Sequence, residues 1–281
     1  MTWNLHCRRD VAGLIGALGL AAAAPASAQQ INPFDGQWHF SVTPYLWLPT
    51  IYVDASVSGP AGIGAIDTGM HTTPGTYLKH LSFAAMITGE ARKGDWSVFT
   101  DYMYLRFKDQ DTTVKAVSGP RGRTVGFADV GSEIDLTGNV WTLAGSYTVW
   151  REGAKHVDVF AGFRYLGLDM DLDWSVSGTR GILPGLQGSA SGDINKWDGI
   201  IGVKGQIPLS ADGRWFMPYY FDVGSGSDNK TWQALVAAGY RFDWGNVTLS
   251  LRSLSYDFSG RNSNSVDARF TGLALGASVL F

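Results

Sequence analysis

Two polar side chains near the start of the first apolar stretch could do hydrolytic chemistry. In the segment HFS, His39 and Ser41 stand two residues apart, so both side chains point to the same face if the segment is a strand. A histidine base beside a serine hydroxyl is a pairing that activates a nucleophile for ester or lipid hydrolysis. No third residue is obvious, so we expect that the chain is not an enzyme and keep a hydrolase as an alternative.

Three carboxylates at alternate positions could bind a cation. The segment DMDLD places Asp169, Asp171 and Asp173 on one face of an extended strand, and carboxylate oxygens of this kind bind Ca²⁺. The spacing lacks the glycine and the terminal glutamate of a helix–loop–helix calcium site. We therefore expect solvated carboxylates at the rim of a sheet, and we predict no metal and no other cofactor.

Charged side chains also occur inside otherwise apolar stretches. They are Glu90, Arg92, Asp101, Asp158, Arg164, Asp198, Lys204, Asp222, Arg241 and Arg252. Acidic and basic members are equal in number, whereas an ion-selective pore usually carries an excess of one sign. The balance favours ion pairs that cross an interior. The expected forked partners of Asp101, Asp158 and Asp222 are Arg164, Arg241 and Arg252.

The elements that must position these charges are strands. Ten stretches carry apolar or aromatic residues at every second position over about 9–11 residues, the length with which a tilted strand crosses a bilayer. The charges fall on the opposite parity, and a Lys or Arg facing lipid at mid-membrane would cost about 2–4 kcal/mol. The pattern predicts an all-β fold, a closed antiparallel up-and-down transmembrane barrel of about ten strands, with eight or twelve strands as alternatives.

Aromatic residues lie at both ends of the apolar faces. Trp38 and Trp96 begin two of the stretches, and Trp141 and Trp197 stand at the opposite ends of two others. Membrane–water interfaces favour such rings, which form two girdles around a barrel. A soluble β-sandwich also alternates, but it would place large aromatic residues inside and charges outside. The aromatic pattern therefore favours the membrane barrel.

The connections between the stretches are alternately tight and long. KGD and REGA are tight, whereas long connections span roughly residues 49–77, 108–133 and 174–194. Short periplasmic turns and long extracellular hairpin loops alternate in this way. Each long connection contains Val-Ser-Gly, which we interpret as a hairpin tip rather than a repeated binding finger.

Two prolines, Pro44 and Pro218, fall within the predicted strands. A closed barrel has no free edge, so each proline removes a donor from a hydrogen-bonded ladder. We therefore expect a bulge or a slipped strand boundary at both positions.

The first residues have the pattern of an export signal. Two arginines precede the apolar run VAGLIGALGLAAAA and a small-residue site, as in cleaved signal peptides. We expect cleavage of residues 1–28 and a single barrel domain over residues 29–281. Loss of the signal changes Lys+Arg from 22 to 20 and Asp+Glu from 25 to 24. The resulting net charge, 20 − 24 = −4, does not favour a nucleic-acid partner.

Several segments resemble the porin-like outer-membrane barrels of Gram-negative bacteria, a poorly characterised family. They are PYLWLP (44–49), GFRYLGL (162–168), WDGIIGVKG (197–205), FDVGSGSDNKTWQALVAAGYRFDW (221–244) and the terminal Phe281. The chain is also distantly similar to the eight-stranded membrane domain of outer-membrane protein A. The resemblance carries no assigned catalytic or ligand residues.

The resemblance implies where the chain works and what it meets. It implies the outer membrane, with lipid and lipopolysaccharide around the barrel and the barrel-assembly machinery reading the terminal Phe281. It implies a narrow porin-like channel for small solutes. The alternative is a closed structural or adhesive barrel that acts through its extracellular loops. Omptin proteases are also ten-stranded and use an Asp pair with an Asp–His pair. DMDLD could mimic the first pair, but the chain has no Asp-x-His.

Overall fold

The protein is described by a computed structural model over residues 32–57, 66–118, 124–178, 186–259 and 265–281. Its strands are β1 (Trp38–Val57), β2 (Ile66–Thr72), β3 (Leu81–Lys93), β4 (Trp96–Ser118), β5 (Thr124–Glu152), β6 (Lys155–Gly178), β7 (Leu186–Pro208), β8 (Trp215–Ser225), β9 (Asn229–Phe242), β10 (Gly245–Ser259) and β11 (Ser265–Leu280). The helix α1 (Pro74–Tyr77) is a single turn. Among the described residues, no helix is long and apolar enough to cross a membrane.

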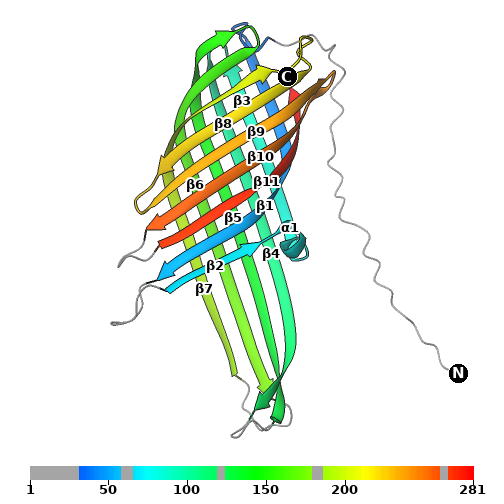
Figure 1. Ribbon diagram of the computed structural model, residues 1–281, viewed down its shortest axis with the longest axis vertical. Helices are drawn as coiled ribbons and strands as arrows, with labels where there is room; N and C mark the ends of the chain where they lie inside the picture. Colours follow the sequence, from blue (N-terminus) through cyan, green and yellow to red (C-terminus); the bar gives the residue numbers. More distant parts are fainter. Residues whose placement is uncertain (1–31, 58–65, 119–123, 179–185, 260–264) are drawn as a thin grey trace, which may run out of the picture.

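Ten of the strands close into an antiparallel barrel (Figure 1). From β3 to β11 each strand pairs with the next in the chain, and β1 closes the ring by pairing with β3 and with β11. We followed the paired residues from strand to strand once around the ring. Starting from Trp38 of β1, this path returns to β1 at Thr50, so the shear of the barrel is 50 − 38 = 12 residues. With spacings of about 3.3 Å along and about 4.8 Å between strands, this stagger gives a tilt of about 40°. The predicted ten-stranded barrel is confirmed.

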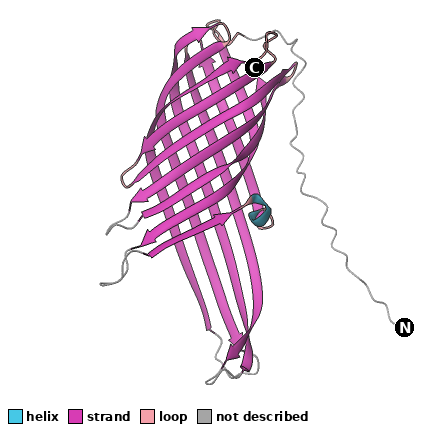
Figure 2. Ribbon diagram, in the orientation of Figure 1, coloured by secondary structure: helices cyan, strands magenta, loops and turns pink. Residues whose placement is uncertain are grey.

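The two ends of the barrel differ. At one end, the short-turn rim, tight turns carry Gly94 and Gly153 with φ of 57° and 59°, values that glycine adopts without steric cost. At the other end, the long-strand rim, β4–β7 extend far beyond the remaining strands (Figure 2). The predicted hairpins above the membrane are therefore continuous strands of up to 29 residues. The first two Val-Ser-Gly tips lie partly outside the described residues, and residues 1–28 lie wholly outside them. The third, residues 176–178, is the paired end of β6 and not itself a turn.

The outer surface of the barrel is apolar. Leu275 is 57% exposed and Val203 is exposed on the same outward parity. Trp197 contacts Trp141 and Tyr165 near the long-strand rim, and Trp215 contacts Tyr240 near the short-turn rim. Both aromatic girdles are present. The inward parity carries the charges, so the barrel is apolar outside and charged inside.

The prediction of a bulge or slipped boundary at the prolines is wrong. The β1–β11 pairs on either side of Pro44 keep one register, and so do the β8–β9 pairs on either side of Pro218. Each proline interrupts the ladder locally because it lacks an N–H, but the flanking pairs hold the register. On the other side of β1, the pair of Pro44 with Ile87 is the last one between β1 and β3.

A further strand lies outside the ring. Among the described residues, β2 pairs only with the far half of β1, from Ile51 to Val57. Between Pro44 and Ile51, no pair among the described residues joins β1 to β3. We name this interval, Tyr45–Thr50 of β1 facing Leu81–Met86 of β3, the seam.

Candidate functional site in the barrel lumen

The deepest ion pair in the lumen joins β6 to β8. The guanidinium of Arg164 donates to both carboxylate oxygens of Asp222, at 3.1 and 2.5 Å, and both side chains have no exposed surface. Arg164 also donates to the hydroxyls of Thr142 and Thr231, each at 3.2 Å. A buried guanidinium needs this density of acceptors because burying an unpaired charge is costly.

A second ion pair crosses from β10 to β4. Arg252 Nη2 lies 2.5 Å from Asp101 Oδ2, and it also donates to Gln233 at 2.8 Å. The hydroxyl of Tyr45 donates to Asp101 at 2.6 Å and accepts from Arg252 at 2.9 Å. The pair therefore ties four strands, β1, β4, β9 and β10, across the barrel.

A third cluster lies nearer the short-turn rim. Arg92 pairs with Asp158, and Thr148 donates to the same carboxylate at 2.6 Å. Glu90 accepts from Arg92 at 3.0 Å and from Lys204 at 2.7 Å. Two acids and two bases thus neutralise one another in one layer of the lumen.

Two of the ten sequence-predicted charges have other partners. Arg241 donates to the Gly213 carbonyl at 2.8 Å and stacks on Phe216, and within the described residues no carboxylate pairs with it. Asp198 is buried and accepts from Asn229 at 2.7 Å. The expected role of Arg241 in a forked pair is therefore wrong, since it lies at the short-turn rim, beyond the carboxylates.

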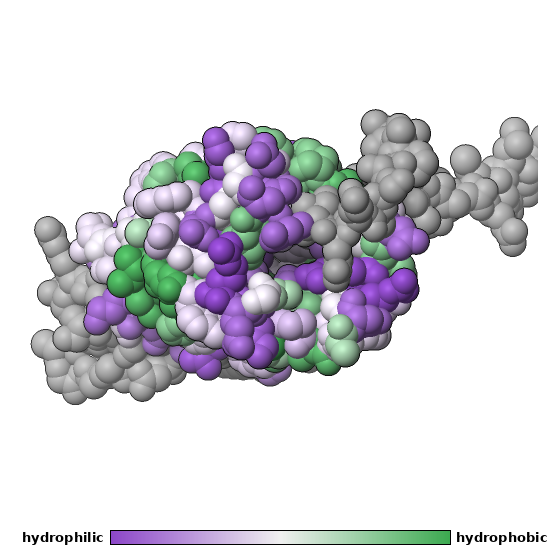
Figure 3. Space-filling model, turned by 90° about the horizontal axis from the view of Figure 1, so that it is seen from above, coloured by the Kyte–Doolittle hydropathy of each residue, from purple (hydrophilic) through white to green (hydrophobic). Residues whose placement is uncertain are grey.

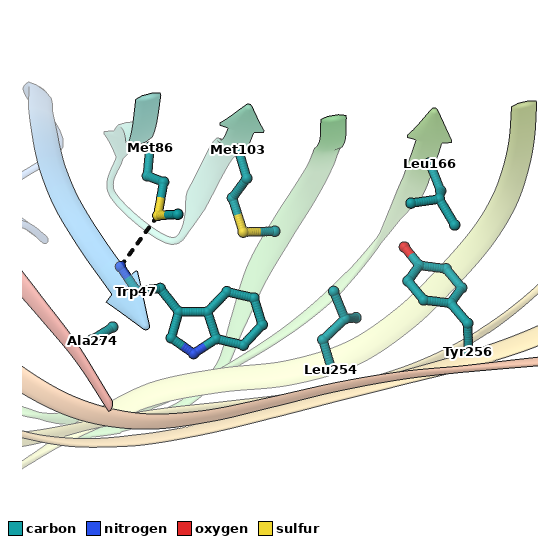
Figure 4. Packing of buried hydrophobic residues seen from close by; sticks show 7 residues of the cluster. All are labelled: Trp47, Met86, Met103, Leu166, Leu254, Tyr256 and Ala274. Carbon is teal, nitrogen blue, oxygen red and sulfur yellow. Dashed lines mark hydrogen bonds between the residues drawn. The ribbon is translucent and has the colours of Figure 1, made fainter. Parts of the chain in front are cut away.

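The lumen half toward the long-strand rim holds an apolar cluster. Seven buried residues form the cluster drawn in Figure 4: Trp47, Met86, Met103, Leu166, Leu254, Tyr256 and Ala274. A second cluster of Phe99, Ala144, Phe160 and Ile200 lies among the charged layers, with Tyr220 packed against it. Phe160 and Tyr220 neighbour the exposed Val159 and Phe221 along their strands, so both point into the lumen. Side chains therefore fill the lumen at several levels.

The segment before β1 packs Phe34 against the short-turn end of the barrel. The ring of Phe34 lies 5.2 Å from that of His156, and the guanidinium carbons of Arg92 and Arg151 lie 5.1 and 4.6 Å from its centroid. Such cation–π contacts hold an aromatic ring in place. Figure 3 views this end, where hydrophilic residues gather. Sequence reasoning missed Phe34 because no periodic pattern marks a residue outside the strands.

The candidate hydrolytic pair has a third member that the sequence reading missed. His39 Nε2 lies 2.8 Å from Asp35 Oδ1, while in the described part of the chain no hydrogen bond joins His39 to Ser41. The Gln37 amide and His39 lower the pKa of Asp35. An oriented histidine is present, but the contact that would activate the serine is not shown.

The three aspartates of DMDLD are exposed on the outward face of β6, beyond the apolar band. Across the described residues, no group of three or more His, Cys, Asp or Glu side chains is placed to hold a metal ion. Asp171 is paired in register with Asp135, whose carboxylate accepts from Arg106 and Lys108. Those hydrogen bonds lower the pKa of Asp135 to about 2.

Two hollows remain. One, of about 160 Å³, lies inside the lumen between the ion pairs and is lined by residues that include Glu90, Lys204, Asp101 and Arg252. The other, of about 640 Å³, lies toward the long-strand rim over β1 and β8–β11, where Tyr52, Trp232, Lys230, Asp267 and Arg269 contribute to the lining. The first is lined by charged and apolar side chains, among them Phe99 and Leu235, whereas the second combines aromatic rings with both signs of charge.

These observations decide the architecture. A closed ring of tilted strands with an apolar outer surface and a charged interior is the arrangement of a barrel that spans a membrane. The chain has the fold of an outer-membrane β-barrel. No protein-family model matches it, and no curated protein matches it. The expected similarity to outer-membrane protein A stays a prediction.

Solved structures of low sequence identity are similar to the chain. The outer-membrane protease OmpT from Escherichia coli is 12% identical, with 91% of this chain and 100% of that chain covered and a TM-score of 0.49. The translocator domain of the autotransporter NalP from Neisseria meningitidis is 14% identical, with 85% and 88% covered and a TM-score of 0.37. Ail, the attachment invasion locus protein of Yersinia pestis, is 8% identical, with 86% and 97% covered and a TM-score of 0.28. The similarity concerns the fold alone.

Proposed function

We propose that the chain is a closed outer-membrane barrel that acts at its long-strand rim, outside the cell. The observation that carries this proposal is the filled lumen. Arg164 and Asp222 have no exposed surface, the buried apolar cluster lies beyond them toward the long-strand rim, and Phe34 packs against Arg92 and Arg151 at the short-turn end. A solute would have to break buried ion pairs to pass. The hollow of about 640 Å³ toward the long-strand rim is of the size that ligand sites have.

The setting of this proposal follows from outer-membrane barrels in general. Short turns face the periplasm and longer loops face outward. We therefore infer export through a cleaved signal over residues 1–28, insertion by the barrel-assembly machinery, and contact of the apolar band with lipid and lipopolysaccharide. The terminal Phe281 supports this assembly, since its N–H and carbonyl pair with Phe40 at 3.0 and 2.7 Å and its ring stacks on that of Phe40.

A planar bilayer tests whether the lumen is closed. Refolded protein is expected to give no discrete conductance, because ion pairs and apolar side chains occupy the cross-section. Arg252→Ala removes the side chain that joins Asp101, Tyr45 and Gln233, and it should produce brief openings. Regular openings of the unmodified protein would overturn the closed-barrel proposal.

A porin-like narrow channel for small solutes is the second candidate. The hollow of about 160 Å³ between the ion pairs favours it, because rearrangement of Arg252 and Lys204 would enlarge an existing space. Steady conductance in the unmodified protein would support this candidate. We propose no enzymatic role, and the test is hydrolysis of lipid esters: turnover that His39→Ala abolishes would establish one.

A further inference from the structure

The seam is a break in the barrel wall. Everywhere else in the ring, neighbouring strands exchange backbone hydrogen bonds along most of their shared length. Between Tyr45–Thr50 and Leu81–Met86, no backbone pair within the described chain joins the two strands. Backbone groups left unpaired in lipid cost several kcal/mol, so side chains must replace the ladder here.

Two side chains do replace it. The N–H of Trp47 donates to Met86 Sδ at 3.2 Å (Figure 4), and the hydroxyl of Tyr77 donates to the Pro49 carbonyl at 2.8 Å. A thioether is a weak acceptor, and methionine is unbranched and adaptable. Pro49 has no N–H of its own to satisfy. Closure of the seam therefore rests on movable side chains rather than on a ladder.

The seam lies within the lipid-facing band. Leu46 on β1 and Phe83 on β3 flank it on the outward parity, and they are 48% and 56% exposed. Directly behind it, Trp47 and Met86 belong to the apolar lumen cluster, with Met103 of β4 beside them. The seam therefore separates lipid from an apolar part of the lumen, and no backbone ladder among the described residues closes it.

We propose that the seam is a lateral binding site for an apolar chain from the surrounding lipid. The acyl chain of an outer-leaflet lipid enters between β1 and β3, displaces the thioether of Met86 from the Trp47 N–H, and packs against Met103 in the apolar half of the lumen. The occupant is apolar because both the flanks and the interior at this depth are apolar. The charged layers nearer the short-turn rim stop it from going further.

Single-cysteine labelling in lipid bilayers tests the proposal. The experiment uses the full chain with Cys7→Ser, which removes its one native thiol. In this background, Met103→Cys places a thiol behind the seam. Phe99→Cys is the matched control, because both residues lie on β4, are 4% and 6% exposed, and belong to different lumen clusters. The probes are a maleimide attached to a phospholipid acyl chain and a sulfonated water-soluble maleimide. Phe83→Cys reports the rate at a lipid-facing position.

The expected result is labelling of Met103→Cys by the acyl-chain maleimide about tenfold faster than labelling of Phe99→Cys, as local opening at the seam predicts. The water-soluble reagent should leave both thiols unmodified. Equal rates at the two positions would overturn the proposal, and so would faster labelling of Met103→Cys by the water-soluble reagent, which means entry through a mouth. Protection that rises with protein concentration would also overturn it, because a second copy would then cover the seam. Leu254→Cys, in the same cluster, replaces Met103→Cys if that variant does not fold.

Discussion

Removal of one partner from the deepest ion pair should destabilise the barrel strongly. In Asp222→Ala, Arg164 loses both carboxylate contacts, at 3.1 and 2.5 Å, and keeps only the hydroxyls of Thr142 and Thr231. Neither partner has exposed surface, so solvent cannot replace the lost acceptor. Breaking a buried pair in this way costs about 3–5 kcal/mol.

The assay is reversible urea unfolding of the refolded protein in detergent micelles, followed by tryptophan fluorescence. Three variants are compared with the unmodified protein: Asp222→Ala, the double variant Arg164→Met with Asp222→Leu, and Asp228→Ala. The double variant removes both charges and should lie much nearer the unmodified protein, because a buried pair contributes little net stability over an apolar replacement. Asp228→Ala removes the exposed pair with Lys196, 2.6 Å long, and should change the stability little, because exposed ion pairs contribute little.

The reasoning is refuted if Asp222→Ala unfolds with the same free energy as Asp228→Ala. It is equally refuted if the double variant is as unstable as Asp222→Ala, since the loss would then come from packing and not from an uncompensated Arg164 charge.

Three further predictions concern the wall and the rim. Leu275→Lys puts a cation on a side chain that is 57% exposed to lipid, and the free energy of unfolding should fall by about 2–4 kcal/mol; an unchanged value would contradict a lipid-facing band. Gly202→Ala would push a methyl group against the Phe160 ring and a β8 carbonyl, and the same unfolding assay should show a loss of about 1–3 kcal/mol. The pKa of Asp135 is held at about 2, below its usual 3.8, so its pair with Arg106 stabilises the strands fully above pH 3.8 and less as the pH falls toward 2. The protection factors of amides in β4 and β5, which correct each exchange rate for its intrinsic pH dependence, should therefore fall between pH 4 and pH 2, and Asp135→Asn should remove that fall.

The alternation of apolar residues was enough to predict the ring. Alternation with a period of two divides the side chains of each strand between two faces. A cation such as Lys204 on the lipid face would destabilise the barrel, so the face without charges must be the one that meets lipid. Ten strands, the tight turns and the long hairpins all follow from that constraint, and each is present in the structure.

Partner choice inside the lumen could not be predicted in the same way. It depends on stagger, because 12 residues of shear bring Arg252 of β10 level with Asp101 of β4, and no local pattern encodes shear. Tyr45 and Gln233 were missed as members of that cluster for the same reason.

The seam could not be predicted from the sequence either. Pro44 was recognised as a disruption, but the sequence does not tell on which side of β1 the ladder ends. The direction in which each backbone group points is known only once both neighbours of the strand are known.

The unequal heights of the wall have a mechanical consequence. β5 has 29 residues, which at about 3.3 Å per residue is a ribbon about 95 Å long, against a hydrocarbon core of about 30 Å. The same four strands, β4–β7, run from the far tips down to the layer where Arg164 lies, with hydrogen bonds along their shared length. A force on the far tips of β4–β7 is therefore transmitted along continuous strands to the side of the barrel that carries Arg164. It bends the barrel as a whole rather than moving one loop.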